Sequence, residues 1–245
     1  MIEVSEISKT FTSSSRQVNA LDRISFSVPG RDFVSIIGPS GCGKSTLLKI
    51  IGDIIEPSFG SITVDGVPSR EARLKGMFSF VFQNPVLLPW RTVIDNVRLP
   101  LEILHRNGRD ASALLDLVGL HGLEHQYPSE LSGGMQHRVA LARALTFDPR
   151  ILLMDEPFSA VDEFTRDILN VELLRIWQEI GVTIFFITHS ISEAVFLSDR
   201  VLLLSGRPAR VKQFRSIPFA RPRDNSLKDS QEFQEVVKCL REDLG

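Results

Sequence analysis

The stretch Gly38-Pro-Ser-Gly-Cys-Gly-Lys-Ser-Thr46 decides the fold that this sequence predicts. It fits the pattern G-x-x-x-x-G-K-[ST], in which glycines let backbone N–H groups converge on phosphate oxygens at the positive end of a helix. An apolar run at 33–37 precedes it, and a helical pattern at 45–51 follows. We therefore expect a phosphate site, called here the glycine cradle, with Lys44 as its cation and the Ser45 hydroxyl as a magnesium ligand. Its expected lining residues are Gly38, Pro39, Ser40, Gly41, Cys42, Gly43, Lys44, Ser45 and Thr46.

Two carboxylates follow a second apolar run further along the chain. Residues 151–154 form a pattern typical of a buried strand, and Asp155 and Glu156 come directly after it. We expect Asp155 to hold magnesium at the end of the strand and Glu156 to act as general base toward an attacking water. A lone Asp-Glu pair is more often a helix cap, but the glycine cradle upstream favours the catalytic interpretation.

A second glycine-rich stretch, Leu131-Ser-Gly-Gly-Met-Gln136, also precedes a helical pattern. We call it the signature loop. By itself, Ser-Gly-Gly before a helix usually forms an N-cap and a tight turn. The chain has two such loops but one carboxylate pair, so the signature loop either meets a phosphate that this chain does not itself hold, or is only a turn.

Polar residues also follow other apolar runs. Gln83 comes after 77–82, and His189 comes after 182–187. A glutamine can ligate magnesium and position water, and a histidine can hydrogen-bond a γ phosphate. An isolated histidine is more often structural, so His189 gains its interpretation from the motifs around it.

Composition excludes several classes of protein. The chain has 245 residues, 43% of them hydrophobic, and a formal net charge of −2, which argues against an electrostatically driven nucleic-acid binder. Cys42 and Cys239 form no metal-binding or disulfide pattern. No stretch approaches the roughly 20 apolar residues of a membrane span, so we expect any role at a membrane to come through a partner.

The order of patterns predicts an α/β fold. Apolar strands alternate with helices, which implies a mostly parallel sheet buried on both faces. Early turn-bounded strands add an antiparallel β subdomain, and 84–145 is a helical insertion that includes the signature loop. We expect one domain with a core at 1–83 and 146–215 and a short C-terminal extension at 216–245.

Taken in order, these motifs resemble those of an ABC-type ATPase across nearly the whole chain. The resemblance identifies the cradle as Walker A, Gln83 as the Q-loop, 131–136 as the signature, Asp155-Glu156 as Walker B, and His189 as the switch histidine, while 159–162 becomes the D-loop. It implies a P-loop NTPase core of the RecA-like type, with ATP and Mg²⁺ as ligands. A P-loop kinase or GTPase would not explain the signature loop or His189.

The resemblance also implies a dimer of ATPase subunits stabilised by ATP. Each ATP would lie between the cradle of one subunit and the signature loop of its partner. The residues that would meet ATP in trans are Leu131, Ser132, Gly133, Gly134, Met135, Gln136 and Asp162. Phe11 would stack on the adenine, although burial in a strand is an alternative for this ring.

Three segments, at 85–97, 127–135 and 218–223, are similar in sequence to importers of the nitrate, sulfonate, taurine and pyrimidine-precursor group. The segment 85–97 carries Leu88, Pro89, Trp90 and Arg91, which in importers would contact the membrane permease subunit, unless Trp90 is local core. The tail segment 218–223 is Pro-Phe-Ala-Arg-Pro-Arg. The resemblance therefore implies a peripheral subunit at the cytoplasmic face of the inner membrane and a separate solute-binding protein, with no nucleic-acid partner.

Two alternatives remain. A soluble ABC ATPase acting on nucleic acid or ribosomes would carry a coiled coil or a second cassette, neither of which is present, and a nucleotide-gated binding subunit would not need Glu156 and His189. His137 and Ser190 depart from the usual family pattern. Cys42 at a helix start could be redox-sensitive or simply a small residue.

Overall fold

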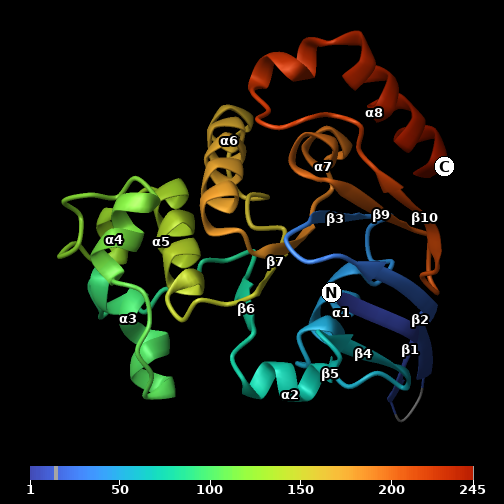
Figure 1. Ribbon diagram of the computed structural model, residues 1–245, viewed down its shortest axis with the longest axis horizontal. Coiled ribbons are helices and arrows are strands. Elements are labelled where there is room, and N and C mark those ends of the chain that lie inside the picture. The colour runs from blue at the N-terminus through green and yellow to red at the C-terminus, as the bar shows by residue number, and fades with distance from the viewer. Residues whose placement is uncertain (14–15, 245) are drawn as a thin grey trace. The chain divides into compact units, whose positions relative to one another are not determined.

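A computed structural model describes residues 1–13 and 16–244 of the chain (Figure 1). The chain forms two compact units. The first contains Met1–Lys75 and Thr183–Gly245, and the second contains Gly76–Val182. The predicted subdomain boundaries at 83/84, 145/146 and 215/216 stay predictions, because this division follows packing and not the motifs.

The first unit begins with an antiparallel sheet of strand order β2-β1-β4-β5. Its strands are β1 (Ile2–Ser13), β2 (Arg16–Val28), β4 (Phe59–Val64) and β5 (Val67–Pro68). Ile2 and Val4 of β1 are buried, while Glu3 and Ser5 between and after them are exposed. This alternation buries one face of the sheet, as its antiparallel arrangement permits.

A second sheet in the same unit carries the cradle. The strands of this sheet that belong to the first unit are β3 (Phe33–Ile37), β8 (Thr183–Ile187), β9 (Arg200–Leu204) and β10 (Val211–Ser216). Strand β3 pairs in parallel with both β8 and β9, and β10 is antiparallel to β9. Every residue of β3 and β8 is buried, because α1 (Lys44–Ile51) contacts β8 and α7 (Ile191–Leu197) contacts β3.

The first unit is completed by α2 (Ser69–Leu74), the short helix η2 (Asn225–Asp229) and α8 (Gln231–Leu244). Helix α8 packs on α7 (Figure 1). It buries Phe233, Val236, Val237 and Leu240, which lie three and four residues apart and so share one helix face.

The second unit contains two parallel strands and five helices among the described residues. The strands are β6 (Phe78–Val81) and β7 (Ile151–Asp155), and the helices are α3 (Val93–Leu104), α4 (Ala111–Leu117), η1 (Pro128–Glu130), α5 (Gly133–Leu145) and α6 (Glu163–Ile180). Helix α5 packs against α3, α4 and β6. An ion pair of 2.7 Å between Arg138 and Glu172 joins α5 to α6.

The predicted fold class is confirmed, because mostly parallel strands, an antiparallel sheet and a helical segment are all present. Two short helices, α2 and α7, had no sequence prediction. Each is six or seven residues long, which is too short for a helical period to stand out. Among the described residues, no helix combines the length and the apolar character that crossing a bilayer needs.

Candidate functional site

The glycine cradle lies in the first unit, between the end of β3 and the start of α1. Gly43 has a φ of 128°, and a Cβ on it would lie 2.9 Å from Leu21 Cδ2 and 3.1 Å from the Ala20 carbonyl oxygen. Gly41 has a φ of 68°. Side chains are therefore excluded where the loop turns, which leaves backbone N–H groups as the lining that a phosphate would meet.

Lys44 places its charge within the cradle. Its side chain is buried, with 5% of the residue exposed, and Nζ donates to the Gly38 oxygen at 2.9 Å and the Pro39 oxygen at 3.1 Å. A buried ammonium that donates to carbonyl oxygens and still carries its full charge is suited to an anionic ligand. Ser45 and Thr46 are half-buried in the first turn of α1. Cys42 is 1% exposed, so its thiol is sheltered from oxidants.

His189 follows β8 at the same end of the sheet as the cradle. Ile36 of β3 pairs with Ile187 of β8, so both strands lead into their loops side by side. The His189 loop is closed by polar contacts, because Thr188 Oγ1 donates to Glu193 and accepts from Ser190 N at 3.0 Å. His189 itself is exposed. Ser190 caps α7 by accepting from Glu193 N at 3.2 Å, so this departure from the family pattern retains an N-cap.

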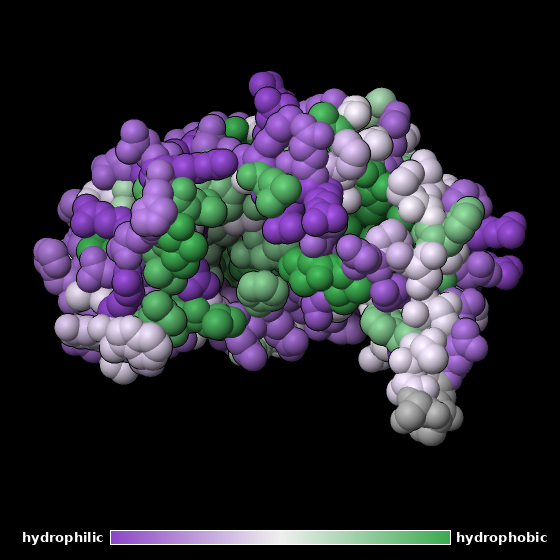
Figure 2. Space-filling model, turned by 90° about the horizontal axis from the view of Figure 1, so that it is seen from below, coloured by the Kyte–Doolittle hydropathy of each residue, from purple (hydrophilic) through white to green (hydrophobic). Residues whose placement is uncertain are grey.

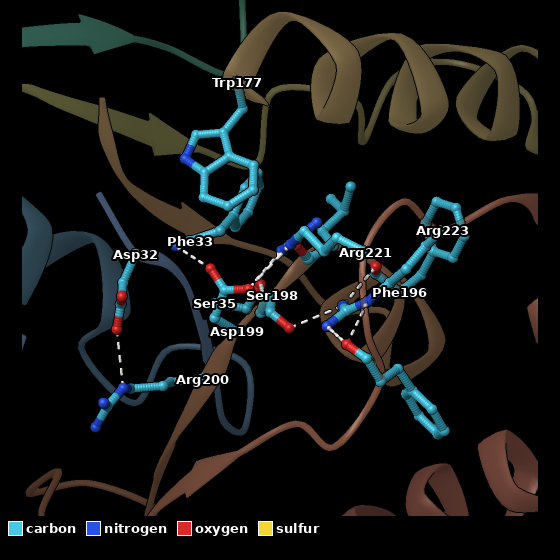
Figure 3. Close-up of polar contacts among 12 residues, drawn as sticks. Asp32, Phe33, Ser35, Trp177, Phe196, Ser198, Asp199, Arg200, Arg221 and Arg223 are labelled. Carbon is cyan, nitrogen blue, oxygen red and sulfur yellow. Dashed lines mark hydrogen bonds and ion pairs between the residues drawn. The ribbon is translucent and has the colours of Figure 1, made fainter. Parts of the chain in front are cut away.

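Arginines of the C-terminal extension hold the other end of α7 (Figure 3). Arg223 Nη1 donates to the carbonyl oxygens of Val195, Phe196 and Ser198 at 2.9–3.1 Å. Burial lowers the pKa of Arg223 to about 10. Arg221 pairs with Asp199 at 2.9 Å.

The same end of α7 is tied to β3, the strand that leads into the cradle. The Ser198 hydroxyl donates to Ser35 of β3, and Asp199 accepts from Phe33 N at 2.8 Å (Figure 3). The extension therefore fixes α7, which begins beside His189, and α7 in turn is bonded to β3. The sequence prediction gave Arg221 and Arg223 no role. Two arginines around a proline, after a run with few other charges, were the available signal.

Phe11 lies on β1 and is 42% exposed. Its ring has the Lys9 ammonium 5.2 Å from its centroid. The alternative that Phe11 is buried in a strand is wrong. The exposed ring face is compatible with the expected stacking role, which stays a prediction.

In the second unit, Gln83, Asp155 and Glu156 lie at one edge. Val81 of β6 pairs in parallel with Met154 of β7, so the residues just beyond these strands meet at the same end. Gln83 is exposed and both acids are half-buried. Glu156 has a φ of 50°, which is uncommon for a residue with a side chain and typical of strained functional positions.

The turn from Glu156 to Asp162 is internally bonded. Ser159 Oγ donates to the Glu156 oxygen at 3.0 Å, and Arg166 Nη2 donates to the Val161 oxygen at 2.9 Å. Asp162 caps α6 by accepting from Thr165 N at 2.9 Å. This backbone hydrogen bond lowers the pKa of the exposed Asp162 carboxyl.

The signature loop combines a cap with an open surface. Leu131 is buried, whereas Ser132 and Gly133 are exposed. Ser132 caps α5 by accepting from Met135 N at 3.3 Å, and Gln136 Nε2 donates to the Pro128 oxygen at 2.9 Å. A Cβ on Gly134 would lie 3.4 Å from Thr165 Cγ2 of α6. The loop therefore lies beside the start of α6 and next to Asp162.

His137, one turn further along α5, is buried. Burial lowers the pKa of its imidazole. Its ring meets Phe158 edge-on, with centroids 6.3 Å apart, and its Nδ1 has no hydrogen-bond partner in the part of the chain that the structure describes. His137 thus joins the signature helix to the turn after Glu156 by ring packing.

The segment 88–91 forms a tight turn before α3. Trp90 is 71% exposed, so the alternative that it is local core is wrong. Leu88 is half-buried, Pro89 is exposed, and Arg91 pairs with Glu102 at 2.6 Å. Asn96, which the sequence prediction passed over, is fully buried. It accepts from Leu88 N at 2.8 Å and donates to the Leu88, Arg91 and Thr92 oxygens at 3.0–3.1 Å.

Comparisons with known proteins agree with these motifs. A family model described as ABC transporter matches residues 21–159. An uncharacterised ABC transporter ATP-binding protein of Methanocaldococcus jannaschii is 44% identical, over 99% of this chain and 91% of its own length. The aliphatic sulfonates import ATP-binding protein of Bacillus cereus is 41% identical over 97% and 93%. The taurine import ATP-binding protein of Rhizobium johnstonii is 45% identical over 98% and 95%.

A solved structure is similar throughout. It is the dimeric post-hydrolysis state of an ATP-binding cassette bound to ADP and phosphate, with a TM-score of 0.77 and 30% identity. The match covers 90% of this chain and 100% of the solved one.

Proposed function

This chain belongs to the ABC transporter family of ATP-binding proteins, and from that premise we propose that it is the ATP-hydrolysing subunit of an importer. The observation that carries the proposal is the cradle, where Gly43 leaves no room for a side chain and Lys44 is buried against carbonyl oxygens. Such a loop is complementary to a chain of phosphates and to little else.

The proposed reaction is ATP + H₂O → ADP + phosphate. The Glu156 carboxylate takes a proton from the attacking water, whose oxygen forms a bond to the γ phosphorus while the bond to the β–γ bridging oxygen breaks. The cradle N–H groups and Lys44 hold the β and γ phosphates. His189 donates a hydrogen bond to the γ phosphate from its exposed position after β8.

A magnesium ion fits the oxygen donors that the motifs supply. The Ser45 hydroxyl, the Gln83 amide oxygen and the Asp155 carboxylate are ligands that this hard cation prefers. When bound, magnesium would neutralise charge on the β and γ phosphates. We propose these three residues as its protein ligands.

We propose that two copies of the chain complete each ATP site. The exposed Ser132 and Gly133, with the N-terminus of the 13-residue helix α5 behind them, offer donors to a γ phosphate held by the partner's cradle. The similarity to a dimeric cassette bound to ADP and phosphate supports this arrangement. Met135, Gln136 and Asp162 shape the same surface.

A membrane permease subunit is the proposed partner of the face around Trp90. An apolar groove of about 330 Å³ lies in the second unit, and Figure 2 shows apolar side chains gathered around a hollow on that side of the molecule. The groove is lined by Phe80, Phe82, Leu99, Ile103, Leu104 and Phe147. Phe82, Ile103 and Leu104 are each more than 40% exposed, which is typical of a protein-binding surface.

The Trp90 face is linked to the signature loop through α5. Arg143 of α5 donates to the carbonyl oxygens of Pro85 and Val86 at 2.6 and 2.9 Å, and Asn96 fixes the turn at 88–92. A partner that moves this turn would therefore pull on the helix that begins with the signature loop. This is how we propose that ATP-driven closure reaches the membrane subunits.

The relatives named as sulfonate, taurine and nitrate import proteins favour a small anionic or zwitterionic solute for this importer. A separate solute-binding protein would select it. The chain would work as a peripheral subunit at the cytoplasmic face of the membrane, attached through the permease.

Recovery of partners tests the proposal. The tagged chain is purified from its native host as wild type, as Trp90→Ser and as Leu74→Ser, a control in which an apolar side chain with 64% exposure is changed on α2. We expect wild type and Leu74→Ser to recover a polytopic membrane protein, and Trp90→Ser to recover at least about tenfold less. Soluble ATPase activity should be similar in all three.

The outcome also separates the alternatives. Recovery of ribosomes or nucleic acid without a membrane protein would favour the soluble ABC ATPase. Absence of ATP hydrolysis by wild type, with Mg-ATP bound, would favour the nucleotide-gated subunit.

A further inference from the structure

Hydrogen bonds join the two ends of the turn between β9 and β10, residues 205–210, in the first unit. Ser205 N donates to the Arg210 oxygen at 2.9 Å, and Arg210 N donates back to Ser205 Oγ at 2.8 Å. Ser205 Oγ also donates to the oxygens of Gly206 and Pro208. These bonds fix the backbone of the turn, although most of its residues are exposed.

The turn is joined to β2, whose Leu21 packs against the cradle. Ala209 N donates to the Ala20 oxygen and Asp22 N donates to the Ala209 oxygen, both at 2.9 Å. Arg210 pairs with Asp22 at 2.5 Å. Because Ala20 and Leu21 lie against Gly43, the turn supports the C-terminal side of the cradle.

The same turn reaches the tip of the cradle through Arg207. Its Nη2 donates to the Gly41 carbonyl oxygen at 2.6 Å. Behind it, a Cβ on Gly38 would lie 3.0 Å from the Leu204 oxygen, so the start of the cradle also packs on the end of β9. The segment 204–210 therefore contacts the first residue of the cradle, Gly38, and its tip, Gly41. Through β2 it also supports the cradle near Gly43.

We propose that Arg207 is a positioning residue for nucleotide binding, acting as a clamp on the Gly41 peptide. The bond from Arg207 holds the oxygen end of the peptide that joins Gly41 to Cys42. The N–H end of this peptide, Cys42 N, donates to the Pro39 oxygen at 3.2 Å, so the two bonds together fix the peptide plane beside Gly41, whose φ is 68°. The guanidinium also brings a positive charge to a loop that must hold a polyanion.

This inference rests on the proposed function, since it names a further residue of the same ATP site. A pre-organised loop binds without a cost for ordering it, so Arg207 acts mainly on affinity for ATP and little on the chemical step. A charged hydrogen bond contributes most when it is sheltered, and solvent weakens an exposed one. We expect a five- to tenfold effect on binding.

The experiment compares wild type with Arg207→Ala, Arg207→Lys and Arg241→Ala, a control that removes an exposed arginine from α8. A fluorescent ATP analogue measures Kd, steady-state hydrolysis measures KM and kcat, and thermal unfolding of the nucleotide-free chain measures stability. Arg207→Ala should raise Kd and KM five- to tenfold, with kcat within about twofold and an unchanged unfolding midpoint. Arg207→Lys should recover part of the affinity, and Arg241→Ala should match wild type.

Two results would overturn this inference and leave the proposed function standing. One is an unchanged Kd in Arg207→Ala, and the other is a raised Kd that accompanies an equal loss of stability or appears equally in Arg241→Ala. Lys44→Ala serves as the reference for lost binding. If wild type binds the analogue no better than Lys44→Ala, the proposed function fails as well, and the inference that rests on it fails with it.

Discussion

The glycine cradle and the signature loop are both glycine-rich turns before a helix, but their surroundings are opposite. In the cradle, a Cβ on Gly43 would meet Leu21 and Ala20 at 2.9 and 3.1 Å, and Lys44 is buried. In the signature loop, a Cβ on Gly133 would meet nothing within 4 Å, and Ser132 is exposed. The cradle is enclosed by its own chain, whereas the signature loop faces outward.

This difference explains why similar sequences at two places serve different purposes. An enclosed loop with a cation of its own can hold a phosphate within one chain. An open loop with a capped helix and no lysine behind it offers donors to a ligand that another molecule brings. Substitutions in the two loops should therefore have different consequences.

The largest effect is expected for Gly43→Ala. At a φ of 128° an alanine is strained, and its Cβ has no space. We expect ATP affinity to fall by about a hundredfold or more, measured with a fluorescent ATP analogue.

Gly133→Ala is the matched control in the other loop. Gly133 begins α5 and has open space around it, so alanine fits and can favour the helix by up to about 1 kcal/mol. ATP affinity of the isolated chain should not change. A similar loss of affinity in both variants would contradict the contrast between the loops.

Ser132→Arg is expected to have the next largest effect. The bulky cation blocks the outward surface of the signature loop without touching the cradle, so ATP hydrolysis should fall by at least about tenfold while Kd for ATP is retained. Ser132→Ala controls for the lost cap, whose removal costs about 1 kcal/mol of stability. Normal hydrolysis by Ser132→Arg would mean that the signature loop is only a structural turn.

The smallest effect is expected for His137, a buried residue of α5, the helix that begins at the signature loop. Burial lowers the pKa of His137 in the fold, while the unfolded chain retains a value of about 6.5. As pH falls below about 6.5 the unfolded chain takes up the proton first, so wild type should lose stability relative to His137→Gln.

Denaturant unfolding at pH 7.5 and pH 5.5 measures this difference. His121→Gln is a control with the opposite sign, because its hydrogen bond to the Asp116 carboxylate raises the pKa of the exposed His121. The stability of wild type relative to His121→Gln should therefore rise slightly as pH falls. An equal change in both variants would exclude burial of His137 as the cause.

The sequence predicted the strands and the long helices well, because apolar runs at 33–37, 151–154 and 182–187 are buried on both faces. It also predicted that Gln83 and Glu156 each follow a strand, as they do after β6 and β7. It did not predict the supports of the site. Asn96, Arg143 and Arg223 act by bonding carbonyl oxygens of residues that become neighbours only in the fold.

The sequence also did not predict the solvent exposure of individual residues. Trp90 and His137 are both residues that can be buried or exposed. In the structure Trp90 is exposed in the turn that Asn96 bonds before α3, and His137 is buried with its ring against Phe158. Neither outcome follows from spacing alone.

The central claim is that the signature loop completes the ATP site of a second copy, and the mass of Glu156→Gln in solution tests it most directly. This variant should bind Mg-ATP without hydrolysing it, so light scattering should find one chain of 27.4 kDa without nucleotide and twice that mass with Mg-ATP. Adding Ser132→Arg to the same variant should keep the protein monomeric in the presence of Mg-ATP. A single chain in every condition, with ATP bound, would contradict the account.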